Sequence, residues 1–144
     1  MFRKLTDTMY ASPQITVDEV AEAKALGVAV IVNNRPEGES DDQTAGAEIE
    51  AAARAAGLDY VAIPVTHAGF SGPQVTAMRQ ALDAAKGAPV LAYCRSGTRS
   101  TLLWALAEAQ DGKDPSALAA NAAQAGYDLS PIRALLDSLA AGAR

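Results

Sequence analysis

The stretch Pro89–Ser100, PVLAYCRSGTRS, contains the only cysteine of the chain, Cys94. The run Pro89–Tyr93 before this cysteine is apolar, as in a strand that is buried on both faces of a parallel sheet. Glycine, hydroxyl and arginine side chains follow it, and a helical pattern begins at Thr98. Ligands of α/β sheets bind beyond the carboxyl ends of the strands, where loops enter helices. The stretch therefore predicts both a fold class and the position of a site.

Short apolar runs alternate with longer amphipathic runs on both sides of this stretch. Such alternation is typical of α/β domains, in which right-handed helical crossovers join parallel strands. We expect a single domain over residues 1–144, with a central, mainly parallel sheet of four to five strands flanked by helices. The expected strands are Met9–Ser12 at an edge, Val28–Asn34, Asp59–Val65 and Pro89–Tyr93, and the expected helices are 16–27, 44–57, 71–86, 98–110, 115–125 and 130–140, with Thr16, Ser71 and Ser130 as caps.

The composition excludes several classes of function. The chain has 144 residues and a formal net charge of −5, without a Lys/Arg cluster, which argues against binding to nucleic acid. No apolar run is long enough to span a membrane. One cysteine cannot form an internal disulfide, and together with one histidine it cannot build a zinc site. No secretory signal follows the basic N-terminal residues, so we expect a cytoplasmic protein without metal or cofactor.

The loop that begins at Cys94 has the composition of an anion-binding cup. Amides of a tight loop and of the first helical turn lack partners within the helix, and the helix dipole favours negative charge there. Gly97 permits a positive φ. A thiol in this setting ionises readily and becomes a nucleophile, while Arg99 can clamp an oxyanion. A buried structural cysteine is the simpler interpretation. We predict Cys94 and Arg99 as catalytic residues, with Arg95, Ser96, Gly97, Thr98 and Ser100 around the substrate.

Three more polar side chains follow the other expected strands. Arg35, within NNRPEGE, is a candidate second cation that Glu39 pairs with. Gln14 follows the first short strand, and His67, the only histidine, follows the third. Because parallel strands end at one edge of a sheet, we expect all three on the rim of the cup and in contact with the substrate. For each of them a solvated loop position is the alternative.

The motif CRSGTRS resembles the active-site loop of rhodanese sulfurtransferases and also the Cys-Arg loop of protein tyrosine and dual-specificity phosphatases. The order of elements over Asp59–Ser100 is similar to that of the dual-specificity phosphatases. Nearly the whole chain resembles a bacterial family called DUF442, or the phosphatase-like domain of beta-lactamase hydrolase-like proteins, in YASPQITVDEV, VIVNNRPEGE, YVAIPV, VLAYCRSGTRS and AGYDLS. The resemblance implies a dual-specificity-phosphatase-like fold, a hydrogen bond from Ser100 to the thiolate, and a persulfide dioxygenase-type metallohydrolase as a possible partner.

Three departures from the phosphatase pattern favour sulfur transfer. Four residues separate Cys94 from Arg99, as in the loop of the rhodaneses. The phosphatase loop that this motif resembles has the pattern Cys-x5-Arg, with five residues in between. Tyr93 stands where that pattern has histidine, and His67 where it has an aspartate as general acid. A phosphate ester needs a proton on its leaving group, whereas thiosulfate and persulfides leave as sulfite or thiolate without one.

We therefore predict a sulfurtransferase that takes sulfane sulfur from thiosulfate or a low-molecular-weight persulfide through a Cys94 persulfide. The chain has no second cysteine, so the acceptor is an external thiol or cyanide. A cysteine-dependent phosphatase is the alternative. A non-catalytic anion- or partner-binding domain is the third interpretation.

Overall fold

A five-stranded sheet with helices on both faces forms the centre of the computed structural model, which describes residues 1–143. The predicted fold class is confirmed. The strands are β1 (Arg3–Thr6), β2 (Met9–Ser12), β3 (Val30–Asn33), β4 (Asp59–Ala62) and β5 (Val90–Tyr93). The helices are α1 (Val17–Ala25), α2 (Gly46–Ala55), α3 (Gly72–Ala84), α4 (Thr98–Gln110), α5 (Pro115–Gln124) and α6 (Arg133–Gly142), with a 3-10 turn at Ser130–Ile132.

The strand order β1-β2-β5-β3-β4 places the cysteine strand in the middle of the sheet. Only the pair β1–β2 is antiparallel within the described chain. Tyr93 at the end of β5 pairs with Ser12 of β2 and with Asn33 of β3, so the three strands end at the same level. The predicted common rim is therefore confirmed. Met9–Ser12 is a strand but not an edge, because β1, a mostly polar strand with Leu5 buried, covers it.

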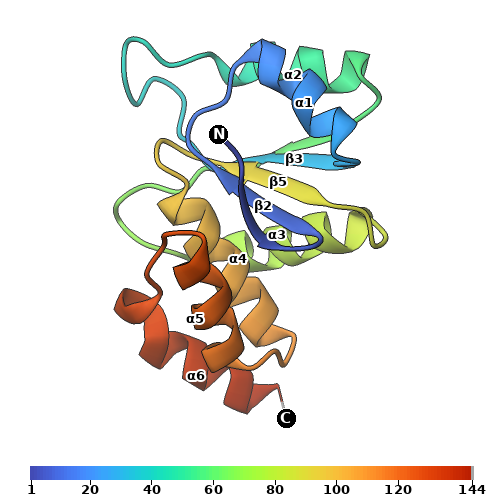
Figure 1. The fold of residues 1–144 in the computed structure, drawn as a ribbon. Helices are drawn as coiled ribbons and strands as arrows, with labels where there is room; N and C mark the ends of the chain where they lie inside the picture. The colour runs from blue at the N-terminus through green and yellow to red at the C-terminus, as the bar shows by residue number, and fades with distance from the viewer. Residues whose placement is uncertain (144) are drawn as a thin grey trace.

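Helices cover the sheet in two layers (Figure 1). α1 and α2 lie on one face, and α3 and α4 lie on the other, where α5 and α6 pack against α4. Alternate side chains of β3 enter the two cores: Ile31 packs toward α1 and α2, while Val30 and Val32 pack on the opposite side. Burial on both faces explains the continuous apolar runs of the central strands. No helix within residues 1–143 is long and apolar enough to cross a membrane.

Three strands are shorter than predicted, and β5 differs least, since it begins at Val90 instead of Pro89. β3 begins at Val30 instead of Val28, and β4 ends at Ala62 instead of Val65. The chain after β4 nevertheless continues alongside the end of β3, because the amides of Ile63 and Val65 donate to the carbonyls of Asn33 and Asn34 at 2.9 Å each. This extended stretch carries Val65 to the rim, where its carbonyl oxygen becomes part of the site.

Helix caps follow the sequence signals in two cases of three. Thr16 and Ser71 accept hydrogen bonds from the backbone at the starts of α1 and α3, in capping boxes. The prediction that Ser130 caps the last helix is wrong. Its own N–H and hydroxyl donate to the Asp128 carboxylate at 2.9 and 2.7 Å, so a 3-10 turn forms first and α6 starts at Arg133.

Candidate active site

Cys94 lies directly after β5, at the base of a closed turn that leads into α4. Cys94 is fully buried, and its backbone amide donates to the Ser12 carbonyl at 3.3 Å. The amide of Gly97 donates to the Cys94 sulfur at 3.1 Å. A main-chain N–H directed at the sulfur stabilises negative charge on it, as expected for the cup. That the thiol is ionised stays a prediction.

Gly97 is the N-cap of α4 and has a φ of 91°, in the left-handed region. A Cβ atom at this position would collide with the hydroxyl of Tyr127 and would lie 3.2 Å from the carbonyl carbon of Ser12. The turn therefore requires glycine for two reasons, the backbone angle and the closeness of its neighbours. The predicted role of Gly97 in shaping the loop agrees with this geometry.

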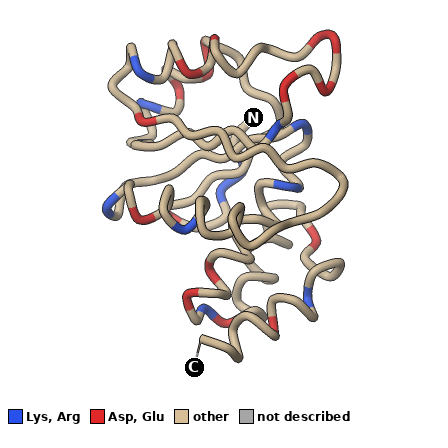
Figure 2. The backbone as a smooth tube through the Cα atoms, turned by 180° about the vertical axis from the view of Figure 1, so that it is seen from behind, with Lys and Arg blue, Asp and Glu red and all other residues tan. Residues whose placement is uncertain are grey.

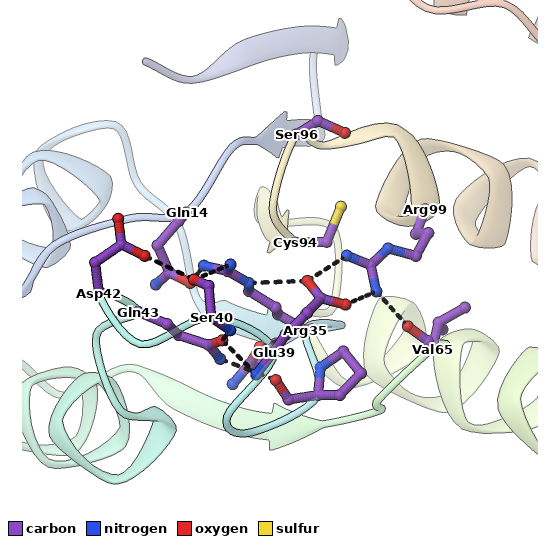
Figure 3. A network of polar contacts seen from close by, with 12 residues as sticks. Gln14, Arg35, Glu39, Ser40, Asp42, Gln43, Val65, Cys94, Ser96 and Arg99 are labelled. Carbon is purple, nitrogen blue, oxygen red and sulfur yellow. Dashed lines mark hydrogen bonds and ion pairs between the residues drawn. The ribbon is translucent and has the colours of Figure 1, made fainter. Parts of the chain in front are cut away.

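Arg99 projects from the first turn of α4 to the side of the cup (Figure 3). Its Nη1 donates to Glu39 Oε2 at 2.7 Å and to the Val65 carbonyl at 2.6 Å, and its Nη2 donates to Glu39 Oε1 at 2.8 Å. The hydrogen bond to Glu39 raises the pKa of Arg99, and the charge of Cys94 raises it further. The guanidinium is therefore close to the sulfur and fixed in direction by a carboxylate.

Arg35 approaches the same carboxylate from the opposite side. Its Nε donates to Glu39 Oε1 at 3.0 Å, Nη1 to Gln14 Oε1 at 3.0 Å, and Nη2 to Ser40 Oγ at 2.8 Å. The predicted pair with Glu39 is confirmed. The alternative of a solvated arginine is wrong, because only 5% of Arg35 is exposed. Arg35 therefore supports the site from behind Glu39.

Gln14 lies on the rim but does not point a free amide into the cup. Its side-chain oxygen accepts from Arg35, and its Nε2 donates to the Ile15 carbonyl at 2.9 Å. Its own backbone amide donates to the carbonyl of Arg95 at 3.4 Å. The expected hydrogen bond from Gln14 to a substrate is thus corrected: both ends of its side chain are used within the rim.

Glu39 is the residue whose importance the sequence showed least. Hydrogen bonds from Arg99 and from Arg35, together with the charges of both arginines, lower its pKa from 4.5 to about 2, against the effect of burial. The carboxylate is therefore ionised at neutral pH. Its spacing four residues after Arg35 was a usable signal for one ion pair, but nothing in the sequence indicated that Arg99, 60 positions away, binds the same group.

A hollow of about 340 Å³ opens beside the cup. Arg95, His67 and Arg99 supply cationic or titratable groups around it, and Phe70 and Leu102 supply apolar walls. Its volume is that of a small-ligand site. His67 and Arg95 are both exposed, so the expectation that they face the same opening agrees with the geometry.

Two loop hydroxyls are arranged on the outer side of the turn. Ser96 Oγ donates to Thr98 Oγ1 at 3.0 Å and accepts from the Thr98 amide at 3.4 Å. Both residues are exposed beside the hollow. The first amide of α4 is therefore already capped, and it is not one of the free donors that were expected.

The predicted hydrogen bond from Ser100 to the thiolate is wrong. Ser100 is fully buried, and its hydroxyl donates to Asn34 Oδ1 at 2.8 Å. Asn34 in turn donates through Nδ2 to the Ile63 carbonyl at 2.9 Å. Ser100 thus ties α4 to the ends of β3 and β4 below the cup. Within residues 1–143 no three His, Cys, Asp or Glu side chains gather in a way that could hold a metal ion.

A mainly parallel α/β sheet with a buried cysteine turn and a clamped arginine defines the class of cysteine-phosphatase-like proteins. The chain belongs to a family within it, because residues 1–112 match the model described as "Beta-lactamase hydrolase-like protein, phosphatase-like domain". A beta-lactamase hydrolase-like protein of Agrobacterium fabrum is 34% identical over 110 residues, and one from Xylella fastidiosa Temecula1 is 35% identical over 109. Each match covers 76% of this chain and 25% of the relative, so the chain matches about a quarter of their length.

Solved structures give the same assignment. A candidate phosphatase from Neisseria meningitidis Z2491 is 35% identical, with a TM-score of 0.81 over 95% of this chain and 96% of that one. A DUF442 candidate phosphatase from Shewanella putrefaciens CN-32 is 26% identical, with a TM-score of 0.76 over 98% and 91%. TpbA of P. aeruginosa, 22% identical with a TM-score of 0.68 over 99% and 89%, shares the fold. None of these relatives is described as a sulfurtransferase, so the comparisons favour the phosphatase alternative over the sulfurtransferase prediction.

Proposed function

We propose that this protein is a cysteine-dependent sulfurtransferase that carries sulfane sulfur on Cys94. The observation that carries the proposal is the short turn. Four residues separate Cys94 from Arg99, and the Gly97 amide lies 3.1 Å from the sulfur. A turn of this length closes over one sulfur atom, whereas the three equatorial oxygens of a phosphoryl group suit the longer Cys-x5-Arg turn.

The lack of a carboxylic acid that could donate a proton to a leaving group also supports sulfur transfer. The segment Ile63–Ser71, which faces the cup, contains no Asp or Glu. The one carboxylate on the clamp, Glu39, has a pKa of about 2 and so holds no proton to donate at neutral pH. Esters with a poor leaving group depend on such a proton, since general acid catalysis contributes about 10²–10⁴-fold. Sulfite and thiolates leave without it.

The reaction proceeds in two steps. The Cys94 thiolate attacks the outer sulfur of thiosulfate or of a persulfide; a new S–S bond forms, the old S–S bond breaks, and its electron pair leaves with sulfite or with the donor thiolate. Cys94 then carries a persulfide, whose negative charge the Gly97 amide and Arg99 stabilise. An external thiolate or cyanide attacks the outer sulfur, takes it away and restores the Cys94 thiolate. No redox cofactor is consumed.

A cysteine-dependent phosphatase is the second candidate, and the comparisons are the observation that favours it. The family description is phosphatase-like, and the solved relatives are described as candidate phosphatases. In this reaction the Cys94 thiolate attacks phosphorus, the ester P–O bond breaks, and the leaving group departs with its electron pair, while Arg99 binds the phosphoryl oxygens. Water then breaks the P–S bond, which releases inorganic phosphate and restores the Cys94 thiolate. Without a carboxylic acid on Ile63–Ser71, aryl phosphates with good leaving groups are the substrates that such a site would favour.

Protein partners of this activity are proposed from the family resemblance. A persulfide dioxygenase-type metallohydrolase consumes the same class of sulfur compound that a sulfurtransferase produces or uses. The curated relatives are named hydrolase-like and are about four times as long as the matched segment. Addition of this protein to such an enzyme should accelerate persulfide turnover only when Cys94 is present. Equal acceleration by the Cys94→Ser variant would contradict the proposed partnership.

Mass spectrometry of the intact protein separates the two reactions. After incubation with thiosulfate, the protein should gain the mass of one sulfur atom, and cyanide should remove it with formation of thiocyanate. Cys94→Ser should gain nothing. Hydrolysis of an aryl phosphate with no sulfur gain would replace the proposal by the phosphatase, and inertness in both assays would leave an anion-binding domain.

A further inference from the structure

Tyr127 contacts the cysteine loop from the C-terminal part of the chain. Its hydroxyl donates to the carbonyl oxygen of Ser96 at 3.0 Å, across 31 positions of sequence. Tyr127 follows α5 and lies outside residues 1–112, which the family model matches. We infer that Tyr127 is a positioning residue, which acts on Cys94 through the peptide unit between Ser96 and Gly97.

The geometry of one peptide unit connects the hydroxyl to the sulfur. The carbonyl of Ser96 and the N–H of Gly97 belong to the same peptide plane, and in a trans peptide they point in opposite directions. Tyr127 binds the carbonyl on one side, and the N–H donates to the Cys94 sulfur on the other at 3.1 Å. The hydroxyl therefore sets the direction of the amide that faces the sulfur.

This peptide needs an external restraint because Gly97 follows it. Glycine has access to both signs of φ, so a rotation of the whole peptide plane costs little here. The rotated form would direct the Ser96 carbonyl oxygen at the sulfur and repel a thiolate. The hydrogen bond from Tyr127 opposes this rotation, and by polarising the carbonyl it also makes the N–H of the same peptide a stronger donor.

Tyr127 is itself held firmly. Only 8% of the residue is exposed, and the guanidinium of Arg3 in β1 lies 5.1 Å from the centre of its ring. Arg3 also donates to the Ala125 carbonyl at 3.2 Å, which joins β1 to the end of α5. Burial raises the pKa of the Tyr127 hydroxyl and outweighs the lowering effect of the Arg3 charge, while the charge of Cys94 raises it further, so the hydroxyl keeps its proton and remains a donor.

The inference rests on the proposed function only in requiring that Cys94 works as a thiolate, and both candidate reactions have this requirement. Arg99 from α4 places a positive charge near the sulfur, whereas Tyr127, from the segment after α5, is neutral and contacts the loop through the Ser96 carbonyl. Arg99 stabilises the thiolate directly. Tyr127 acts through the backbone, and so the two contributions can be separated by substitution.

The decisive variant is Tyr127→Phe, which keeps the ring and its contact with Arg3. Since the chain has one cysteine, the ultraviolet absorbance of the thiolate during a pH titration reports Cys94 alone, with Cys94→Ser as the blank. A weakened hydrogen bond to a charged sulfur should move the titration midpoint up by about one pH unit, and kcat/KM at neutral pH should fall by up to about tenfold. Tyr10→Phe on β2 is the matched control, because it removes a partly buried tyrosine hydroxyl on a strand next to β5 without touching the hydrogen bond to the Ser96 carbonyl.

Three outcomes overturn the inference. If the wild-type protein titrates well below an ordinary thiol and Tyr127→Phe has the same midpoint, Tyr127 has no positioning role and the proposed function stands. If the wild-type protein titrates like an ordinary thiol, both the inference and the proposed function fail. Arg3→Met loosens the Tyr127 ring but keeps the hydroxyl, so a midpoint shift as large as that of Tyr127→Phe would assign the effect to packing.

Discussion

Arg99 and Glu39 bind each other through two hydrogen bonds of 2.7 and 2.8 Å, one from each terminal nitrogen of the guanidinium. The arginine comes from α4 and the glutamate from the loop between β3 and α2. That loop is rich in acidic residues (Figure 2), of which Glu37, Asp41 and Asp42 are exposed, whereas Glu39 turns inward and meets Arg35 as well. Two guanidinium groups around one carboxylate leave a net positive charge beside Cys94, which suits an anionic substrate.

Glu39→Gln should loosen the arginine clamp. The amide of glutamine has the shape of the carboxylate, but it presents an NH₂ group to a guanidinium N–H and carries no charge. We expect kcat/KM for thiosulfate to fall about tenfold, chiefly through KM, since one charge-assisted hydrogen bond contributes about 1.5–3 kcal/mol. Glu48→Gln, at an exposed position in the first turn of α2, is the control and should have wild-type kinetics. Equal kinetics for the two variants would show that Arg99 needs no carboxylate.

The same pair makes the stability of the protein depend on acid pH. The pKa of Glu39 falls from 4.5 to about 2 on folding, so the pair stabilises the folded state fully above pH 4.5 and loses this contribution as the pH falls towards 2. Its size is about 1–3 kcal/mol after allowance for solvent screening. Thermal unfolding curves between pH 2 and 7 should therefore converge for the wild-type protein and Glu39→Gln at the acid end. Parallel curves throughout would assign the acid sensitivity to other carboxylates.

Gly97→Ala tests the steric account of the cysteine turn, and Gly57→Ala is its matched control. Both glycines have positive φ, 91° and 83°, but a Cβ atom meets nothing within 4 Å at Gly57. At Gly57 we expect only the backbone strain, about 1–2 kcal/mol of unfolding free energy, with full activity. At Gly97 the added methyl group also displaces Tyr127 and the turn, so activity should be lost. The measurements are chemical denaturation and sulfur transfer for both variants, and equal activities would contradict the steric account.

The sequence was sufficient for the sheet and for the position of the site because both depend on local patterns. Apolar runs before Asn34 and Cys94 indicated buried parallel strands, and parallel strands end on one rim. β1 was missed because Arg3–Thr6 has one buried apolar residue, Leu5, and no periodicity to detect. The capping boxes at Thr16 and Ser71 were readable because each needs only four consecutive residues.

The hydrogen bonds within the site that join residues far apart in the sequence could not be predicted. Glu39 binds Arg99 across 60 positions, and Tyr127 binds Ser96 across 31. Neither spacing reflects the period of a helix or strand, so only the packed structure joins these residues. The error at Ser100 has a related cause: the resemblance suggested a thiolate partner, whereas the hydroxyl faces Asn34 across 66 positions.

Ser100→Ala should therefore affect stability and leave the sulfur unchanged. Removing the hydroxyl leaves Asn34 Oδ1 without its donor in a fully buried position, which costs about 1–3 kcal/mol of unfolding free energy. Because no hydrogen bond to Cys94 is lost, the midpoint of the thiolate absorbance titration should stay at the wild-type value, in contrast to Tyr127→Phe. A rise of that midpoint in Ser100→Ala, with wild-type stability, would mean that the hydroxyl serves the thiolate after all, as the phosphatase resemblance implied. Ser100→Thr keeps the hydroxyl and adds a methyl group at a fully buried position, so it too should lower the free energy of unfolding, through overpacking, and leave the titration midpoint unchanged.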